Sequence, residues 1–320
     1  MRRIFQIVSI ALLIILLVSL PFVTDKDSLI NLVILIFLYI ILASSWNILG
    51  GYTGQTSLGH AAFFGIGSLV ARLLWTDGFP YLGSLLAGGV VAVLFALLIG
   101  VPAFRLKGVY FAIGTLALGQ ILNITVGNVF PNISSLPVED LAAYQLLPRY
   151  FLVFAVTLIT IGSTYLLVNS RLGLGIMSVR EDEDAAESLG VSAIRHKLIA
   201  LTLSAFFTGL AGGAFAYYHV SYYFNFPFTP VWSFDALTMV YIGGQGTIIG
   251  PIIGAVFFVL LREFLVLNLG EYHLIVFGVL FILVVLFLPG GIVEAWERTR
   301  KLVTRLSGSK GVPGLSEKIG

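Results

Sequence analysis

Few side chains in this sequence of 320 residues could carry out chemistry. There is no cysteine, which excludes disulfides, thiolate nucleophiles and cysteine metal ligands. The four histidines are scattered without the spacing of known metal-binding motifs: His60, His196, His219 and His273. Neither a catalytic triad nor a G-x-x-x-x-G-K-[ST] phosphate-binding loop can be recognised. We therefore expect that the chain is not an enzyme and binds no metal or cofactor, so that any ATP driving it is bound by another subunit.

The densest charged stretch is SVREDEDAAESLG at 178–190, in a chain that is otherwise strongly apolar. Hydrophobic residues make up 58% of the sequence and charged residues 11%, whereas about a quarter of a soluble domain is charged. The mean hydropathy is +1.01, and the 35 glycines suit membrane helices that pack closely or break. The sequence predicts an all-α polytopic membrane bundle, with a single transmembrane domain over 1–320.

Continuous apolar runs of about 20 residues, the length that crosses a bilayer, predict about ten crossings. They cover residues 4–23, 29–49, 58–75, 81–104, 109–127, 150–168, 198–218, 233–249, 251–268 and 272–288. The first run is longer than the apolar part of a signal peptide, and no small-residue cleavage site follows it. We therefore expect the first span to be retained.

The positions of lysine and arginine agree with this count, because these residues collect in cytoplasmic loops. With ten crossings, the basic groups at 2–3, 105–107, 171–197 and 298–305 fall on one side of the membrane. The loops at 24–28, 128–149 and 220–232 fall on the other side and carry little net positive charge. We expect two cytoplasmic termini, a cytoplasmic loop at 169–197 and a basic cytoplasmic tail at 296–320.

Two glycine-rich segments, at 50–67 and 243–254, interrupt the apolar pattern. Irregular backbone at membrane depth is tolerated where it lines a cavity or is buried in protein. We expect a translocation path along these segments, with Gly54, Gln55, Ser57, Gly59, His60, Gln120, Gly243, Gly244 and Gln245 as candidate residues. Close helix packing by Gly246, Gly250 and Gly254 is an equally good interpretation of the second segment. Gln120 and Asn123 share a helix face, which also suits a bond to a neighbouring helix.

The charged stretch predicts a short helix over 179–189. Ser178 and Glu181 match the S-x-x-E capping box, acidic residues follow near the helix start, and Gly190 is a natural stop. Ala185, Ala186 and Leu189 then share one face that a partner could approach closely. A solvated loop with one helical turn is the alternative interpretation.

The source of energy can also be inferred from charge. Ion-coupled carriers need Asp, Glu or Arg within their spans, and the predicted spans are nearly free of them. Glu263 stands beside Arg262 near a helix end and can pair with it. This pattern favours an external motor over an ion gradient.

Several motifs resemble those of ABC importer permeases. The run D-A-A-E-S-L-G at 184–190 is similar to their E-A-A-x-x-x-G cytoplasmic loop, with Asp184 where that family often has Glu. The segments at 51–67, 105–117, 179–190 and 243–254, with F-L-P-G-G-I at 287–292, resemble in the same order the permeases of branched-chain amino acid importers of the LivM type. The resemblance covers residues 29–295.

The resemblance implies a permease subunit in the plasma or inner membrane of a bacterium or archaeon, which moves branched-chain amino acids. Its implied partners are the lipid bilayer, a second homologous permease, two cytoplasmic ATPase subunits and an extracytoplasmic substrate-binding protein, but no nucleic acid. Coupling to the ATPases is implied for Arg180, Glu181, Asp184, Ala185, Ala186, Leu189 and Gly190. Urea or another small solute is an alternative substrate, and an ion-coupled carrier is a less favoured alternative mechanism.

Overall fold

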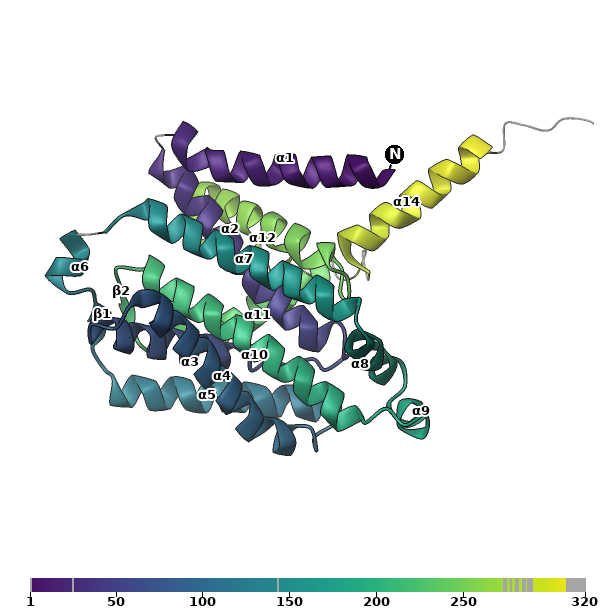
Figure 1. Ribbon diagram of the computed structural model, residues 1–320, viewed down its shortest axis with the longest axis horizontal. Helices are drawn as coiled ribbons and strands as arrows, with labels where there is room; N and C mark the ends of the chain where they lie inside the picture. The colour runs from purple at the N-terminus through teal and green to yellow at the C-terminus, as the bar shows by residue number, and fades with distance from the viewer. Residues whose placement is uncertain are drawn as a thin grey trace, which may run out of the picture.

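The computed structural model describes residues 2–24, 26–142, 144–272, 275–276, 278–279, 282–283, 286 and 290–308. Most of this chain forms helices that run side by side, with one two-stranded sheet (Figure 1). The elements in chain order are α1 (Arg2–Val23), α2 (Asp27–Gly50), α3 (His60–Thr76), α4 (Tyr81–Ala103), α5 (Val109–Val129), β1 (Ile133–Ser135), α6 (Val138–Ala142), α7 (Leu146–Val168), α8 (Arg171–Glu181), α9 (Glu183–Ser188), α10 (Ala193–Tyr218), β2 (Ser221–Tyr223), η1 (Phe226–Phe228), α11 (Val231–Gly243), α12 (Ile249–Leu269), η2 (Gly270–Tyr272) and α14 (Gly291–Gly308).

The two ends of the bundle carry different elements (Figure 1). The start of α1, the short helices α8 and α9 and the root of α14 lie at one end, which we call the α8–α9 end. Strands β1 and β2 and helix α6 lie at the opposite, β1–β2 end. The two strands pair antiparallel, with Ile133 opposite Tyr223. The start of the first described helix and the root of the last thus lie at the same end (Figure 1).

Six of the described helices are long and apolar enough to cross a membrane: α2, α4, α5, α7, α10 and α12. Shorter apolar stretches occur in α1 and α11, and α3 has 17 residues. The helical membrane bundle predicted from the sequence is therefore confirmed, while six such helices fall short of the predicted ten crossings. The last predicted span, 272–288, lies largely outside the described residues.

Several predicted helix boundaries are wrong, and α7, for example, begins at Leu146 and not at 150. The helix predicted over 233–249 ends at Gly243, because Gly244 and Gly246 adopt φ values of +134° and +72° that interrupt helical backbone. Helix α10 begins at Ala193, before the predicted start at 198. Its polar first turn extends beyond the apolar run, and Lys197 in that turn pairs with Glu183 of α9 at 2.6 Å.

The centre of the bundle is a close contact among α3, α4 and α10. A Cβ built on Gly67 would lie 2.0 Å from the Gly209 carbonyl oxygen, and one on Gly212 would lie 1.9 Å from that of Phe64. Only glycine fits at such distances, as in other closely packed membrane helices. The neighbouring side chains of Trp46 and Phe215 are buried. This packing places the glycine-rich start of α3 within a rigid core.

Candidate coupling and translocation sites

The two glycine-rich segments predicted from the sequence contact one another at the C-terminal end of α2. Asn47 of α2 donates from Nδ2 to the Thr247 carbonyl at 2.8 Å and accepts from the Gly246 amide at 2.9 Å. Gln245 donates from Nε2 to the Gly50 carbonyl, also at 2.9 Å. We call residues 50–55 and 243–250 together the glycine junction. Its hydrogen bonds join the end of α2 to the connection between α11 and α12.

Arg180, in the last turn of α8, lies against both halves of the junction. A Cβ on Gly54 would lie 3.3 Å from the Arg180 Cγ, and one on Gly246 would lie 2.4 Å from its Nη1. Both glycines have positive φ, +70° and +72°, a backbone region that other residues rarely adopt. The junction is therefore shaped to receive the arginine side chain. It brings a predicted coupling residue together with predicted path residues.

The alternative interpretation of the second segment, close helix packing, is correct for part of it. A Cβ on Gly243 would lie 1.8 Å from the Gly250 carbonyl oxygen, and one on Gly254 would lie 1.9 Å from that of Met239. Gly243, Gly250 and Gly254 thus allow α11 and α12 to touch. Gly246 is not part of this ridge, because it precedes α12 and faces Arg180. Gln55, the last residue of the first half of the junction, is half-buried, and its backbone amide donates to the Leu49 carbonyl at 3.3 Å.

The predicted single helix over 179–189 is wrong, because the backbone breaks at Asp182. This residue is extended, with φ −157° and ψ 112°, and its carboxylate accepts from the Ala185 amide at 2.9 Å. Asp182 therefore ends α8 and caps α9, which is the role that the sequence assigned to Ser178. The Ser178 hydroxyl instead donates to the Gly175 carbonyl within α8 at 2.9 Å. Gly190 has φ +85° and follows the end of α9, as predicted.

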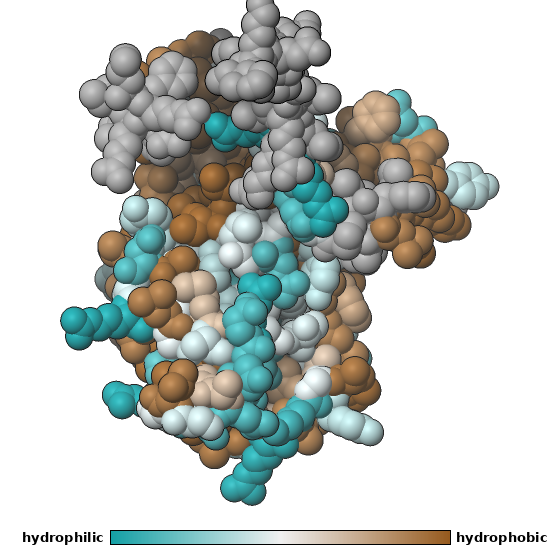
Figure 2. Space-filling model, turned by 90° about the vertical axis from the view of Figure 1, so that its right-hand side faces the viewer, coloured by the Kyte–Doolittle hydropathy of each residue, from teal (hydrophilic) through white to brown (hydrophobic). Residues whose placement is uncertain are grey.

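The predicted docking face of this loop is also wrong in one residue. Ala186 is 3% exposed and packs with Val179 and Ala193, so it cannot contact a partner. Leu189 is 86% exposed, and the remaining predicted coupling residues are exposed as well: Arg180, Glu181, Asp184, Ala185 and Gly190. The view onto the α8–α9 end shows hydrophilic side chains along its centre with hydrophobic ones on either side (Figure 2). This distribution suits a water-exposed end of a membrane bundle.

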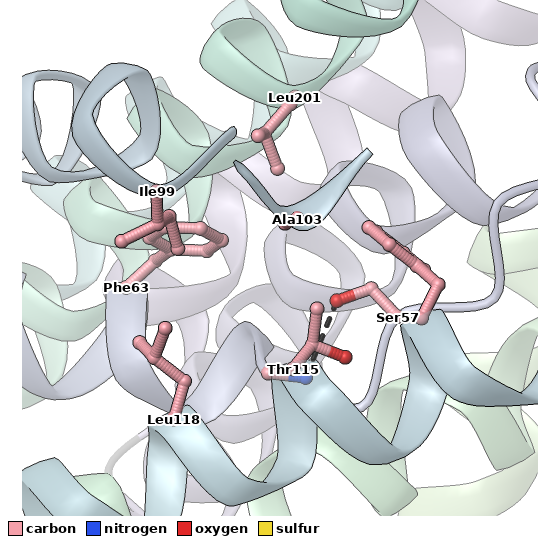
Figure 3. A pocket seen from close by; sticks show the side chains of 9 residues that line it. Ser57, Phe63, Ile99, Ala103, Thr115, Leu118 and Leu201 are labelled. Carbon is pink, nitrogen blue, oxygen red and sulfur yellow. Dashed lines mark hydrogen bonds between the residues drawn. The ribbon is translucent and has the colours of Figure 1, made fainter. Parts of the chain in front are cut away.

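Two of the predicted path residues, Ser57 and Gly59, line a small cavity between α3, α4, α5 and α10 (Figure 3). Ser57 and Thr115 supply its hydroxyl groups, and the Ser57 Oγ accepts from the Gly59 amide at 3.2 Å. The remaining walls are apolar, with Phe63, Ile99, Phe111, Leu118 and Leu201 among them. The cavity has room for about one water molecule. The cavity is therefore too small for any molecule much larger than water.

His60 and Gln120, the two remaining predicted path residues, lie outside both the junction and the cavity. His60 is fully buried, and its Nε2 is 2.8 Å from the Ser204 Oγ, which itself donates to the Ser45 carbonyl. His60 therefore joins α3 to α10 without reaching the cavity. Gln120 is exposed on α5, whereas Asn123 donates to the Asn225 carbonyl at 3.0 Å. The alternative interpretation, a bond to a neighbouring element, is thus correct for Asn123.

The few charged side chains in the spans are paired differently from what the sequence suggested. Arg262 of α12 does not pair with Glu263 but with Asp235 of α11, at 3.4 Å, and it donates to the Tyr39 hydroxyl at 2.9 Å. The Tyr39 hydroxyl in turn donates to the same Asp235 carboxylate at 3.1 Å. Arg72 of α3 is fully buried. The sequence shows each of these charged residues alone in an apolar run, and it does not reveal which partners the fold provides.

Arg72 belongs to a group of side chains that bind the end of α10, which we call the α10 cap. Six carbonyls in and after the last turns of α10 accept hydrogen bonds: Gly213 from Tyr81 (2.7 Å), Ala216, His219 and Val220 from Arg72 (3.0, 3.2 and 2.7 Å), Tyr217 from Arg149 (2.9 Å) and Tyr218 from Tyr144 (3.1 Å). Arg72 also donates to the Ser134 hydroxyl of β1 at 2.8 Å. Positive groups are favourable at the negative end of a helix dipole.

The α10 cap also protects its own polar groups. Burial raises the pKa of Tyr144, an effect that the nearby Arg149 opposes, so the phenol stays protonated and can donate to the Tyr218 carbonyl. The Arg149 guanidinium carbon lies 3.7 Å from the centre of the Tyr144 ring and 4.4 Å from that of Tyr217. The β1–β2 end is therefore held by many mutually supporting contacts, in contrast to the glycine junction.

Comparison with known proteins places this architecture. Residues 28–285 match the family described as the permease component of branched-chain amino acid transport systems. The LivM permeases of high-affinity branched-chain amino acid transport from Salmonella typhimurium and Escherichia coli K12 are each 30% identical over 91% of this chain and 75% of their own length. A probable LivM permease from Methanocaldococcus jannaschii is 24% identical over 83% of this chain and 93% of its own.

No solved structure matches the chain. The match to the family model nevertheless spans most of the sequence, and it includes α2 to α12 with both halves of the glycine junction. The chain therefore belongs to the family of multi-pass membrane permeases of branched-chain amino acid transport systems.

Proposed function

We propose that the chain is the transmembrane permease subunit of an ABC importer for branched-chain amino acids. In this assembly a second homologous permease completes the path, two cytoplasmic ATPase subunits supply energy, and an extracytoplasmic binding protein delivers the substrate. The chain itself binds no cofactor, because ATP is bound by its partners. The observation that carries the proposal is the contact of Arg180 with Gly54 and Gly246. This contact joins the exposed segment of α8 and α9 to the helices of the bundle.

The proposed orientation puts the α8–α9 end in the cytoplasm, with both chain termini. Exposed basic residues at this end, such as Arg180 and Arg195, follow the rule that lysine and arginine stay on the cytoplasmic side. Ten crossings result if α1, α3, α11 and the predicted span at 272–288 are added to the six long helices. In support, α12 leaves the junction and α14 returns to it, because Gly291 lies against Gly244.

The proposed coupling follows from the contacts of α8 and α9. The Lys197–Glu183 ion pair and the buried Ala186 hold α9 against the start of α10, so a push on α9 moves both as a unit. Arg180 passes this movement to Gly54 and Gly246. Because these glycines have few conformational restrictions, the C-terminal ends of α2 and α11 can shift against one another. The cavity at Ser57, Gly59 and Thr115 would then open, and its apolar walls suit branched aliphatic side chains.

Reconstitution tests this proposal. The chain is assembled in proteoliposomes with the second permease, the two ATPases and the binding protein, and uptake of labelled leucine is measured. We expect uptake that requires every component and hydrolysable ATP. Leucine uptake by this chain without the ATPases would contradict it. The substrate is best checked by a binding assay on the partner binding protein with leucine, isoleucine, valine and urea, since urea or another small solute remains the alternative cargo.

An ion-coupled carrier is the alternative mechanism, and one observation favours it. Asp235 and Arg262 form a charged pair within α11 and α12, and charged residues in membrane spans often carry ion coupling. Their mutual pairing with Tyr39 equally suits a structural role. Imposing a proton or sodium gradient on ATP-free proteoliposomes separates the two mechanisms, because only a carrier would accumulate substrate.

A further inference from the structure

Helix α14 has a two-sided sequence, GIVEAWERTRKLVTRLSG. With 3.6 residues per turn, one side collects the apolar positions Ile292, Ala295, Trp296, Leu302, Val303 and Leu306. The opposite side collects Glu294, Glu297, Arg298, Arg300, Lys301 and Arg305. A helix with one apolar and one charged side buries its apolar side against something. Among the described side chains on the apolar side, Ile292 and Ala295 are half-buried at the root of the helix, and Trp296 is 71% exposed.

The root of α14 lies at the level where the membrane helices end. Gly291 has φ +72°, and a Cβ there would lie 2.6 Å from the Gly244 amide nitrogen. Val293 also lies close to Gly244, with its Cβ 3.2 Å from a Cβ built on that glycine. From this anchor α14 leaves the bundle obliquely (Figure 1). The helix therefore starts at one surface of the bundle.

The composition of α14 indicates what lies against it. Tryptophan is enriched where the bilayer meets water, and arginine and lysine are attracted to anionic lipid headgroups. Basic residues outnumber acidic ones in α14, and one of its two glutamates, Glu294, is already paired with Arg298 at 2.5 Å. The positive side thus complements a negatively charged surface. Low overall hydrophobicity with tryptophan on one side and arginine on the other is the pattern of a helix lying in the membrane interface.

We propose that α14 lies along the membrane surface at the α8–α9 end, with its apolar side in the boundary between headgroups and acyl chains and its basic side among anionic headgroups. Through Gly291 and Gly244 it then fixes the glycine junction relative to the bilayer. This inference rests on the chain being a membrane protein and does not depend on the partner ATPases. Its failure would leave the proposed import function unaffected.

The absence of cysteine makes the test direct. Val303→Cys on the apolar side and the neighbouring Thr304→Cys on the polar side are made in the full chain and labelled with an environment-sensitive fluorophore. The labelled proteins are placed in nanodiscs of phosphatidylethanolamine and phosphatidylglycerol. We expect brominated lipid to quench the label at 303 several-fold more than that at 304, and aqueous iodide to show the reverse order. Equal quenching of both labels by iodide would overturn the proposal.

Two further measurements identify the surface that covers α14. Replacing Lys301 and Arg305 together by glutamine should reduce lipid quenching at 303 in anionic nanodiscs and leave it unchanged in nanodiscs of phosphatidylcholine alone. Arg105→Gln, at an exposed basic residue outside α14, is the matched control and should change neither. If the label at 303 is exposed to iodide until the ATPase subunits are added, and is then shielded, a protein covers α14 and the lipid proposal is wrong.

Discussion

Leu189, which follows α9, is a large apolar residue that the described part of the chain leaves exposed. Its side chain is 86% exposed at the end of α9, and Ala185 and Gly190 are exposed as well. Ala186, which the sequence placed on the same face, is buried against Val179 and Ala193. A tryptophan at Ala186 would therefore disturb the loop's own packing. Leu189 is the better position at which to test docking.

We predict that Leu189→Glu lowers leucine uptake and the ATPase activity stimulated by the binding protein by on the order of tenfold, because a charge replaces an apolar side chain that the partner would bury. Ser188→Glu, one residue earlier and also exposed, adds the same charge outside the proposed contact and should change both activities little. Both are measured in proteoliposomes. Normal coupling in Leu189→Glu would remove this residue from the docking surface.

Gly59, directly before α3, lies against Thr115 of α5 beside the cavity. A Cβ there would lie 2.7 Å from the Thr115 carbonyl oxygen, so Gly59→Val must push the helices apart. We predict at least a tenfold loss of uptake with unchanged assembly, since about 1.4 kcal/mol of distortion already gives that factor. Gly119→Ala is the control across the same contact, because its Cβ would lie 4.0 Å from the Gly59 Cα. Unimpaired uptake by the Gly59 variant would make this glycine a tolerant packing position.

At the scale of elements, the contact between α8 and the glycine junction can be separated from backbone strain. Gly246→Ala combines a left-handed φ of +72° with a 2.4 Å contact to Arg180. Gly78→Ala has a similar strain, at φ +90°, with no atom within 4 Å of the new Cβ. We predict that Gly246→Ala uncouples ATP hydrolysis from uptake whereas Gly78→Ala costs only about 1 kcal/mol of stability. Arg180→Ala in the Gly246→Ala background should relieve the clash but leave coupling impaired. Full recovery in that double variant would mean that Arg180 transmits nothing.

The α10 cap makes a prediction about stability. Arg72→Met leaves the carbonyls of Ala216, His219 and Val220 without their donor, and each buried acceptor without a partner costs about 1–3 kcal/mol. We expect a thermal midpoint in detergent lower by several degrees. Arg105→Met, at an exposed arginine, should stay within about 0.5 kcal/mol of the parent. Arg72→Lys should recover only part of the loss, since lysine has fewer donors in a different geometry. An unchanged midpoint in Arg72→Met would show that the cap is dispensable.

For the whole molecule, the sequence was sufficient where the signal is local and periodic. Apolar runs and glycine clusters predicted the bundle and both halves of the junction, because each is written in consecutive residues. The pairing of Asp235 with Arg262, residues on different helices, and the burial of Arg72 depend on contacts that only the fold creates. The break at Asp182 was missed because two capping patterns overlap in the sequence. In the structure Asp182, and not Ser178, caps the short helix α9. The sequence thus identified the two segments that form the junction but not the contacts within it.

The contrast between the two ends of the bundle predicts where the molecule moves. At the β1–β2 end, side chains from three helices and a loop satisfy six carbonyls of α10. At the α8–α9 end, the junction is held mainly by Asn47 and Gln245, and it contains glycines with positive φ. Local opening requires less free energy where fewer contacts must break. The two ends should therefore differ in hydrogen exchange.

We expect amides at 213–223 to exchange far more slowly than those at 244–249 in hydrogen exchange followed by mass spectrometry of the full chain in nanodiscs. When the ATPases and ATP are added, protection should change at 51–59 and 244–249 and remain constant at 213–223. This follows because Arg180 contacts the junction and has no part in the α10 cap. Equal exchange at both ends, or an ATP-dependent change confined to 213–223, would mean that the moving part of the permease lies at the β1–β2 end and that the glycine junction is a rigid connection.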